Sequence, residues 1–372
     1  MPKNILFLCG GKSAEHEVSL RSTRNVISAL DPQRFCALTV AISRSGSWYL
    51  LRSPQDLENI TEYSDDLPIG ELCTLLRKPN QTVLITVSGQ QIVLDAAFPL
   101  IHGPMGEDGT LQGLLEMFEL PYTGAGVLSS AIGMDKDVLK QRLHHADLPI
   151  VPFVTLNDKE CIPSYEALST QLDSAILFVK PAVMGSSVGV EKVRNAAQYQ
   201  AAVTKAFHYS FKVLIEKFIP GREVECSVLG NRSPSASCVG EIKPHHDFYS
   251  YEAKYLDPNG AELIIPAQLP HAVAETVRRL AISTFQAIEC LGFARVDFFI
   301  TTDDKVYVNE INTLPGFTSI SMYPKMWEAS GLAYTDLVSH LIDLAFEAFE
   351  HKQTIHLRPD CTDILNVQAI AL

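Results

Sequence analysis

The chain has 372 residues, of which 47% are apolar and 20% charged, a balance that excludes a disordered protein and predicts two or three globular domains. Its formal charge of −13 argues against nucleic acid or an anionic membrane surface as a partner. Eight scattered cysteines without a CxxC pair, and no apolar run near the about 18 residues of a membrane span, predict a reduced, cytoplasmic protein.

The first part of the chain repeats a strand followed by a helix. Apolar runs with strand character precede stretches with helical spacing, in two units: strand 5–9 with helix 18–30, and strand 95–101 with helix 110–118. A further strand is predicted at 37–42, whereas the polar and irregular segment 48–82 is predicted to be an insertion of modest structure. This pattern indicates an α/β domain whose ligand loops follow the strands.

The rest of the chain mixes the two element types without a simple repeat. After a helix at 135–145, strands are predicted at 151–156, 177–180, 189–192, 213–218, 225–228, 237–242, 294–300 and 306–311. Helices at 272–291 and 334–349 accompany the later strands. A mixed α+β region therefore follows the α/β domain, and the tail after residue 352 carries no interpretable pattern.

The last two strands form an acidic hairpin. A two-residue turn at Asp303 and Asp304 would pair Asp297 with Glu310 and place Arg295 and Asn312 on the same face. Opposed carboxylates need a positive partner, and oxygen ligands without Cys or His suit Mg²⁺ or Mn²⁺. Arg295 could instead neutralise both acids in a salt-bridge network, and the hairpin alone does not decide between the two.

Two other segments favour phosphate binding. Lys180 ends a strand, and the small residues of 185–189 follow it, with Ser186 and Ser187 as hydroxyl donors beside backbone N–H groups. Taken alone, such a run is more often a flexible loop, and it matches neither a P-loop nor a dinucleotide fingerprint. Lys136, at a helix start, is a further basic residue, and strand 214–219 with its turn could bind an adenine edge and a ribose.

Together these segments resemble the D-alanine–D-alanine ligase family of the ATP-grasp superfamily, over nearly the whole chain. The matching motifs are residues 10–19, 102–113, 134–136, 185–190, 251–255 and 309–316. The resemblance implies an α/β and α+β fold with three-domain ATP-grasp architecture. Its parts would be a Rossmann-like N-terminal domain at 1–124, a central subdomain at 125–215, a C-terminal subdomain with lid and metal site at 216–350, and a tail at 351–372.

The resemblance also implies a reaction. ATP would phosphorylate one D-alanine, and the amine of a second would attack the acyl phosphate to give D-alanyl-D-alanine, a peptidoglycan precursor, with ADP and phosphate released. It further implies a homodimer and Mg²⁺ or Mn²⁺ as cofactor. The lid at 251–255 has the pattern of dipeptide-forming enzymes, so an amine is expected as second substrate, although His245 and His246 keep a depsipeptide-forming enzyme as an alternative.

The implied nucleotide and metal residues fall into four groups. Those expected at the phosphates are Lys136, Lys180, Ser187 and Lys254. Those expected at the base are Glu216, Lys217, Phe218 and Ile219, with Glu223 at the ribose. The metal ligands would be Asp297, Glu310 and Asn312.

The implied substrate and catalytic residues come from all three regions. Glu15 and His102 would lie at the first D-alanine, and Ser321 and Met322 at the second. Arg295 and the Gly316 N–H would stabilise the oxyanion, and a triad of Ser186, Tyr255 and Glu15 would fix the loop over the site. A regulatory protein on a degenerate ligase scaffold is the remaining alternative, and the intact residue set argues against it.

Overall fold

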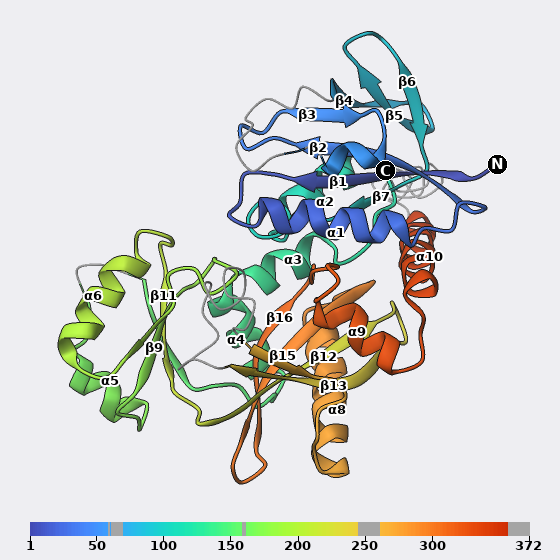
Figure 1. Ribbon diagram of the computed structural model, residues 1–372. Helices are drawn as coiled ribbons and strands as arrows, with labels where there is room; N and C mark the ends of the chain where they lie inside the picture. The colour runs from blue at the N-terminus through green and yellow to red at the C-terminus, as the bar shows by residue number, and fades with distance from the viewer. Residues whose placement is uncertain (59, 61–69, 158–160, 245–260, 356–372) are drawn as a thin grey trace, which may run out of the picture.

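The computed structural model describes residues 1–58, 60, 70–157, 161–244 and 261–355. They form three bodies (Figure 1): an N-terminal body at the top, a central body at the left and a C-terminal body below. Helices α3 (Val127–Met134) and α4 (Lys136–His145) lie at the junction of the three. The predicted lid residues, including Lys254, Tyr255, His245 and His246, lie outside the described residues.

The N-terminal body is a seven-stranded sheet in the order β6-β5-β4-β3-β2-β1-β7. Its strands are β1 (Lys3–Gly10), β2 (Phe35–Ile42), β3 (Trp48–Leu51), β4 (Gly70–Lys78), β5 (Gln81–Thr86), β6 (Gln91–Leu94) and β7 (Ala96–Pro99). β1 runs parallel to both β2 and β7, and its apolar run is fully buried. Helices α1 (His16–Ser28) and α2 (Thr110–Met117) follow β1 and β7, as the strand-and-helix pattern predicts.

The segment 48–82 is a correction to the sequence analysis. Its described residues include β3, β4 and the start of β5, which extend the sheet by antiparallel pairing. The short 3-10 helix Pro54–Glu58 lies between β3 and β4. Only one of the nine residues of β4 is buried. The expectation of modest structure was wrong because antiparallel hydrogen bonds order these strands, while the few apolar side chains that they bury, among them Leu51 and Leu75, give a weak sequence pattern.

The central body has its own sheet and its own core. Four antiparallel strands in the order β10-β9-β11-β8 form the sheet: β8 (Phe153–Leu156), β9 (Leu177–Pro181), β10 (Glu191–Val193) and β11 (Val213–Lys217). Helices α5 (Tyr165–Gln171) and α6 (Ala196–Ala206) accompany it. The buried residues of its cluster come from 156–215 alone, and Leu168, Val179 and Val203 among them are fully buried.

The C-terminal body is a five-stranded antiparallel sheet in the order β14-β13-β12-β15-β16. Its strands are β12 (Gly221–Leu229), β13 (Ser235–Pro244), β14 (Ala261–Ile264), β15 (Phe293–Thr301) and β16 (Val306–Asn312). Helix α8 (His271–Ala287) packs on this sheet, and α9 (Met322–Ala329) and α10 (Tyr334–Gln353) complete the body. α10 rises beside the N-terminal body in Figure 1.

One core joins the N-terminal and C-terminal bodies. Phe7 and Phe98 of the first sheet stack with ring centroids 5.5 Å apart, and Phe98 meets Phe317 edge to face at 6.1 Å. Leu337 and Leu341 of α10 belong to the same buried cluster. These two bodies therefore share apolar packing, whereas the central body keeps a separate cluster.

The acidic hairpin has the predicted pairing but not the predicted turn. Asp297 lies opposite Glu310 and Arg295 opposite Asn312, which confirms the register. The turn is longer than two residues, because the Thr301 N–H donates to the Lys305 carbonyl, and Asp304 has a φ of 62°. A register shift between Asp297 and Phe298 compensates, leaving Asn309 as the extra residue of a β-bulge. Asn309 and Glu310 both reach the same cavity as a result.

The described cysteines are all free thiols. Cys9, Cys226 and Cys290 are buried, and burial raises the pKa of Cys9 to about 12, so these thiols are unreactive. Cys36 and Cys161 are exposed. Among the described residues, none of the helices combines the length and the apolar character that a membrane span needs.

Candidate active site

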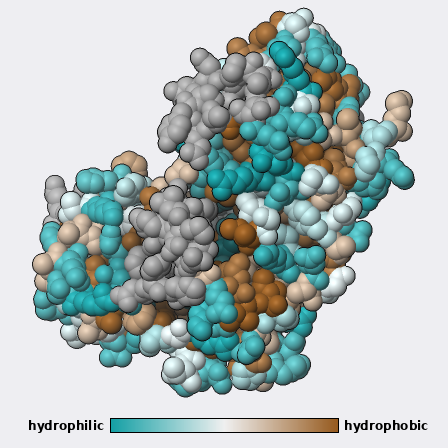
Figure 2. Space-filling model, in the orientation of Figure 1, coloured by the Kyte–Doolittle hydropathy of each residue, from teal (hydrophilic) through white to brown (hydrophobic). Residues whose placement is uncertain are grey.

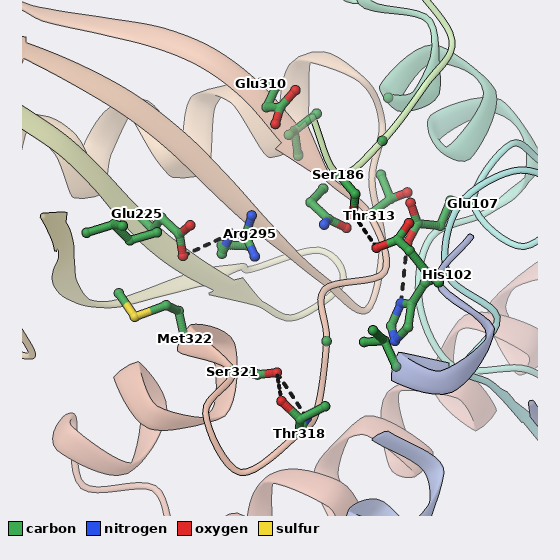
Figure 3. Close-up of a pocket in the computed structure, with 18 of the residues that line it drawn as sticks. His102, Glu107, Ser186, Glu225, Arg295, Glu310, Thr313, Thr318, Ser321 and Met322 are labelled. Atoms are coloured by element: carbon green, nitrogen blue, oxygen red, sulfur yellow. Dashed lines mark hydrogen bonds and ion pairs between the residues drawn. The ribbon is translucent and has the colours of Figure 1, made fainter. Parts of the chain in front are cut away.

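Two adjoining cavities lie where the three bodies meet. The first, of about 440 Å³, is lined by Glu15, His102, Ser186, Arg295, Asn312, Gly316, Ser321 and Met322 (Figure 3). The second, of about 540 Å³, is lined by Lys180, Ser187, Glu216, Lys217, Phe218, Ile219, Glu223 and Asp297. Lys136 and Glu310 line both. Every described residue that the sequence analysis named for the site thus borders one of the two cavities. Figure 2 shows hydrophilic and hydrophobic residues interspersed on the face of the molecule that it presents.

A serine loop connects the central body to the N-terminal body. Ser186 donates a hydrogen bond from its Oγ to the Glu15 carboxylate. Ser186 and Ser187 have φ values of 52° and 58°, a left-handed conformation that is uncommon without glycine. The fold therefore holds these two side chains in a demanding backbone geometry toward the cavities. Two of the three expected triad members are in contact, and Tyr255 lies outside the described residues.

His102 is the centre of a buried polar group. Its Nδ1 lies 3.1 Å from the Leu314 carbonyl and 3.4 Å from Glu107 Oε1, and its Nε2 lies 3.2 Å from Ser22 Oγ. Burial alone would lower the pKa of His102, but the Glu107 carboxylate outweighs it and the pKa is raised. Burial also raises the pKa of Glu107. Figure 3 shows the His102 and Glu107 side chains directed toward one another.

Two predicted lysines face the cavities from different elements. Lys136, the first residue of α4, donates from Nζ to the Met184 carbonyl at 2.7 Å and lies 3.5 Å from Glu310 Oε2. Lys180 lies 2.6 Å from Glu216 Oε2 and donates to Asn309 Oδ1 at 3.4 Å. Both ammonium groups therefore border the second cavity, and each is paired with a carboxylate of the same lining.

Lys140 is a charged residue of this region that the sequence analysis did not identify. Its Nζ lies 2.9 Å from Glu216 Oε1, and the two side chains are only 1% and 2% exposed. Burial would raise the pKa of Glu216, but Lys140 and Lys180 lower it to about 2. The available signal was spacing, because Lys140 follows Lys136 by one helical turn and so shares its face of α4.

The acidic hairpin holds an arginine clamp. Arg295 donates from Nε and Nη2 to the two carboxylate oxygens of Asp297, both at 2.7 Å, and its Nε lies 3.0 Å from Glu225 Oε2. Burial would lower the pKa of Arg295, but the carboxylates of Asp297 and Glu225 raise this pKa well above its ordinary value. The salt-bridge network that the sequence analysis offered as an alternative to a metal is therefore present in part: Arg295 pairs with Asp297 and additionally with Glu225, whereas Glu310 has an ion pair with Lys136.

The metal set predicted on this hairpin consists of two carboxylates and one amide. Among the described residues, no group of three His, Cys, Asp or Glu side chains has an arrangement that could hold a metal ion. The Asn312 Oδ1 accepts the Leu314 N–H at 3.0 Å, which leaves its second lone pair for another partner. The donor atoms are all oxygens, and this chemistry fits Mg²⁺ or Mn²⁺.

The loop after β16 is held by the N-terminal body. Ser22 Oγ accepts the Phe317 N–H at 3.2 Å, and Asn25 Nδ2 donates to the Phe317 carbonyl at 3.2 Å. At Gly316 an added Cβ would lie 2.9 Å from Ser321 Oγ, so a side chain at this position would displace the Ser321 hydroxyl. Ser321 Oγ in turn accepts the Thr318 N–H at 2.9 Å. The Gly316 backbone and the Ser321 hydroxyl therefore lie side by side at the first cavity.

Family comparisons cover most of the chain. Residues 4–125 match the family model described as D-ala D-ala ligase N-terminus, and residues 143–343 match the one described as D-ala D-ala ligase C-terminus. The D-alanine–D-alanine ligase A of Salmonella typhimurium is 48% identical over 347 residues, which are 91% of this chain and 94% of that protein.

Solved structures give the same picture. The D-alanine-D-alanine ligase from Coxiella burnetii superposes with a TM-score of 0.83 at 38% identity, over 95% of this chain and 97% of that one. The VanG D-Ala:D-Ser ligase from Enterococcus faecalis superposes with a TM-score of 0.80 at 33% identity, over 93% of this chain and 100% of that one.

Proposed function

We propose how the residues of this chain carry out the reaction of the family to which it belongs, the D-alanine–D-alanine ligases. The chain has the ATP-grasp fold of this family and catalyses the ATP-dependent ligation of two D-alanines for peptidoglycan synthesis. The observation that carries the proposal is the convergence of three bodies on two adjoining cavities. One cavity collects the residues expected at a nucleotide, and the other collects those expected at two amino acids.

The second cavity is the proposed ATP site. The phosphates of ATP would contact Lys136, Lys180 and the loop that carries Ser187. Lys254, outside the described residues, would be a further contact. The purine would lie along Glu216, Lys217, Phe218 and Ile219, and Glu223 would bind the ribose. Lys136 on α4 and Lys180 on β9 would neutralise part of the charge that builds up during phosphoryl transfer.

Asp297, Glu310 and Asn312 are the proposed ligands of Mg²⁺ or Mn²⁺. Asp297 would then exchange part of its contact with Arg295 for the ion, which frees the guanidinium for other partners. When bound, the ion supplies positive charge beside the ATP phosphates.

The first cavity is the proposed amino-acid site. Glu15 and His102 would bind the first D-alanine, whose carboxylate oxygen attacks the γ-phosphorus to form D-alanyl phosphate and ADP. Ser321 and Met322 would bind the second D-alanine, whose free amine attacks the acyl carbon. Arg295 and the Gly316 N–H would stabilise the resulting oxyanion, whose collapse breaks the C–O bond and releases phosphate, while the attacking nitrogen gives up a proton to leave the neutral amide.

Three further assignments extend this proposal. We propose a homodimer, a cytoplasmic location, and domain boundaries at residues 124, 215 and 350 with a tail beyond. The cytoplasmic location is supported by the use of ATP and by the free thiols of the described cysteines.

The direct test is ADP release by the purified protein with ATP, Mg²⁺ and D-alanine. We expect release that requires both D-alanine and the metal, and none above background with L-alanine. Equal release with L-alanine would contradict the proposed amino-acid site, because a site built for the D-enantiomer misplaces the amine or carboxylate of the other.

The second substrate can be tested by competition. Since one structural relative is named a D-Ala:D-Ser ligase, D-alanine, D-serine and D-lactate should be supplied together and the products weighed by mass spectrometry. We expect D-alanyl-D-alanine as the main product. An excess of D-alanyl-D-serine or of D-alanyl-D-lactate would instead show that the second amino-acid site prefers D-serine or D-lactate.

A further inference from the structure

Lys140 lies behind the proposed nucleotide site rather than in it. The side chain is 1% exposed, and it borders neither of the two cavities. Its Nζ is held 3.4 Å from the Val151 carbonyl and 5.5 Å from the centre of the Phe153 ring. A ligand in the second cavity therefore meets Lys180 and Glu216, but not Lys140.

Glu216 is shared by two lysines that approach it from different elements. Lys140, on α4, lies 2.9 Å from Oε1, and Lys180, on β9, lies 2.6 Å from Oε2. One carboxylate thus compensates two cations, in a place where Glu216 is only 2% exposed. Of these two cations, only Lys180 reaches the second cavity.

Lys180 also faces partners on the other side. It donates to Asn309, and the carboxylates of Glu310 and Glu223 act on it from β16 and β12. A phosphate entering the cavity would compete with Glu216 for this ammonium group. If Lys180 were the only cation at Glu216, that competition would leave a buried carboxylate uncompensated, which is costly.

We propose that Lys140 is a positioning residue of the nucleotide site, which keeps Glu216 compensated so that Lys180 can turn to the phosphates. The inference rests on the proposed ATP site and adds a residue that touches no ligand. Lys140 acts through Glu216, and its effect depends on the phosphate group of the nucleotide rather than on the base.

Lys140→Met tests this dependence, with ADP plus Mg²⁺ and adenosine as the two probes in calorimetric titrations. Without Lys140 the Glu216–Lys180 pair stays neutral, so the free protein is expected to fold. Because only a phosphate draws Lys180 away, ADP should bind about tenfold more weakly, while adenosine changes less than about twofold. Lys205→Met, which removes an exposed partner of Glu191, is the charge-matched control and should change neither.

The double variant Lys140→Met/Glu216→Gln gives an independent readout. An amide needs no cation, so the Lys140→Met change should have little effect on ADP affinity in the Glu216→Gln background. The inference would be overturned if Lys140→Met weakened the binding of ADP and of adenosine equally. It would also be overturned if the loss of ADP affinity were just as large in the Glu216→Gln background. Wild-type protein that binds no ADP would instead overturn the proposed nucleotide site, which distinguishes the two failures.

Discussion

Glu310 is the residue on which the proposed metal chemistry depends most. It faces Asp297 across the hairpin and borders both cavities. We expect Glu310→Gln to lower kcat at least about a hundredfold and to weaken ATP binding much less, because charge stabilisation matters most in the transition state. Steady-state kinetics and an equilibrium ATP titration measure the two effects. Asp303→Asn, at the exposed turn of the same hairpin, is the control, and similar losses in both variants would refute the prediction.

Glu216 gives a prediction about acid stability. Lys140 and Lys180 lower its pKa from 4.5 to about 2, so the folded protein binds this proton less tightly than the unfolded chain does. The resulting stabilisation is fully present above the unfolded pKa of about 4.5 and is lost as the pH falls toward 2. Denaturant unfolding of wild type and Glu216→Gln should therefore differ by a few kcal/mol at neutral pH and converge in acid. A constant difference would contradict the assignment.

Several site residues could be predicted from the sequence, and others could not. Strand alternation, a local property of the backbone, places Glu310 and Asn312 on one face of β16, whereas the pairing of Glu310 with Asp297 also depends on the turn. Glu225 and Ser22 could not be found in this way, because each meets the site through a strand or helix pairing distant in sequence. The roles of Arg295 and Gly316 rest on the family resemblance. The strand register shows only that Arg295 lies on the same face of the hairpin as Asp297.

At the scale of elements, the glycines around α2 provide a matched pair. A Cβ at Gly106 would lie 1.8 Å from the Ile101 carbonyl oxygen, whereas a Cβ at Gly113, inside the helix, would meet nothing within 4 Å. We expect Gly106→Ala to destabilise the fold by several kcal/mol through this clash. Gly113→Ala should stabilise it by about 1 kcal/mol, since alanine favours the helix. Thermal unfolding of both variants measures the contrast, and equal Tm values would refute it.

The hairpin and the N-terminal sheet show where local patterns are insufficient. A two-residue turn predicts that Asp297 pairs with Glu310, and this pairing is correct. In the structure, however, the turn is longer, and the bulge at Asn309 cancels the shift in register that the longer turn causes. A bulge has no reliable sequence signature, because it depends on what each strand packs against. Strand β4 was missed because its pairing buries little apolar surface.

At the scale of the whole molecule, the two kinds of core predict two units of unfolding. The central body has its own buried cluster, whereas the N-terminal and C-terminal bodies share one through Phe98, Phe317 and α10. We expect residues 161–215 to exchange their amide hydrogens as one group and the strands β1, β7 and β15 as another, slower group.

Hydrogen exchange with mass spectrometry, under conditions that favour the native state, checks this division. ADP with Mg²⁺ should slow exchange in the central body more than in β1, because the ligand bridges the central and C-terminal bodies. A single uniform rate for all three bodies would contradict it. The sequence predicted three parts but not the shared core, because apolar periodicity identifies a buried face and not the surface that covers it.

The positions of the thiols allow fluorescent dyes to be attached to two different bodies of this molecule, so that movement between these bodies can be measured. Cys36 lies on β2 of the N-terminal body and Cys161 precedes α5 of the central body, and both are exposed, while Cys9, Cys226 and Cys290 are buried. Once Cys361, outside the described residues, and the partly exposed Cys73 and Cys238 are replaced, a donor and an acceptor dye on Cys36 and Cys161 would measure the distance between the two bodies. The energy transfer between the dyes would report on domain movement during turnover without a new cysteine near either cavity.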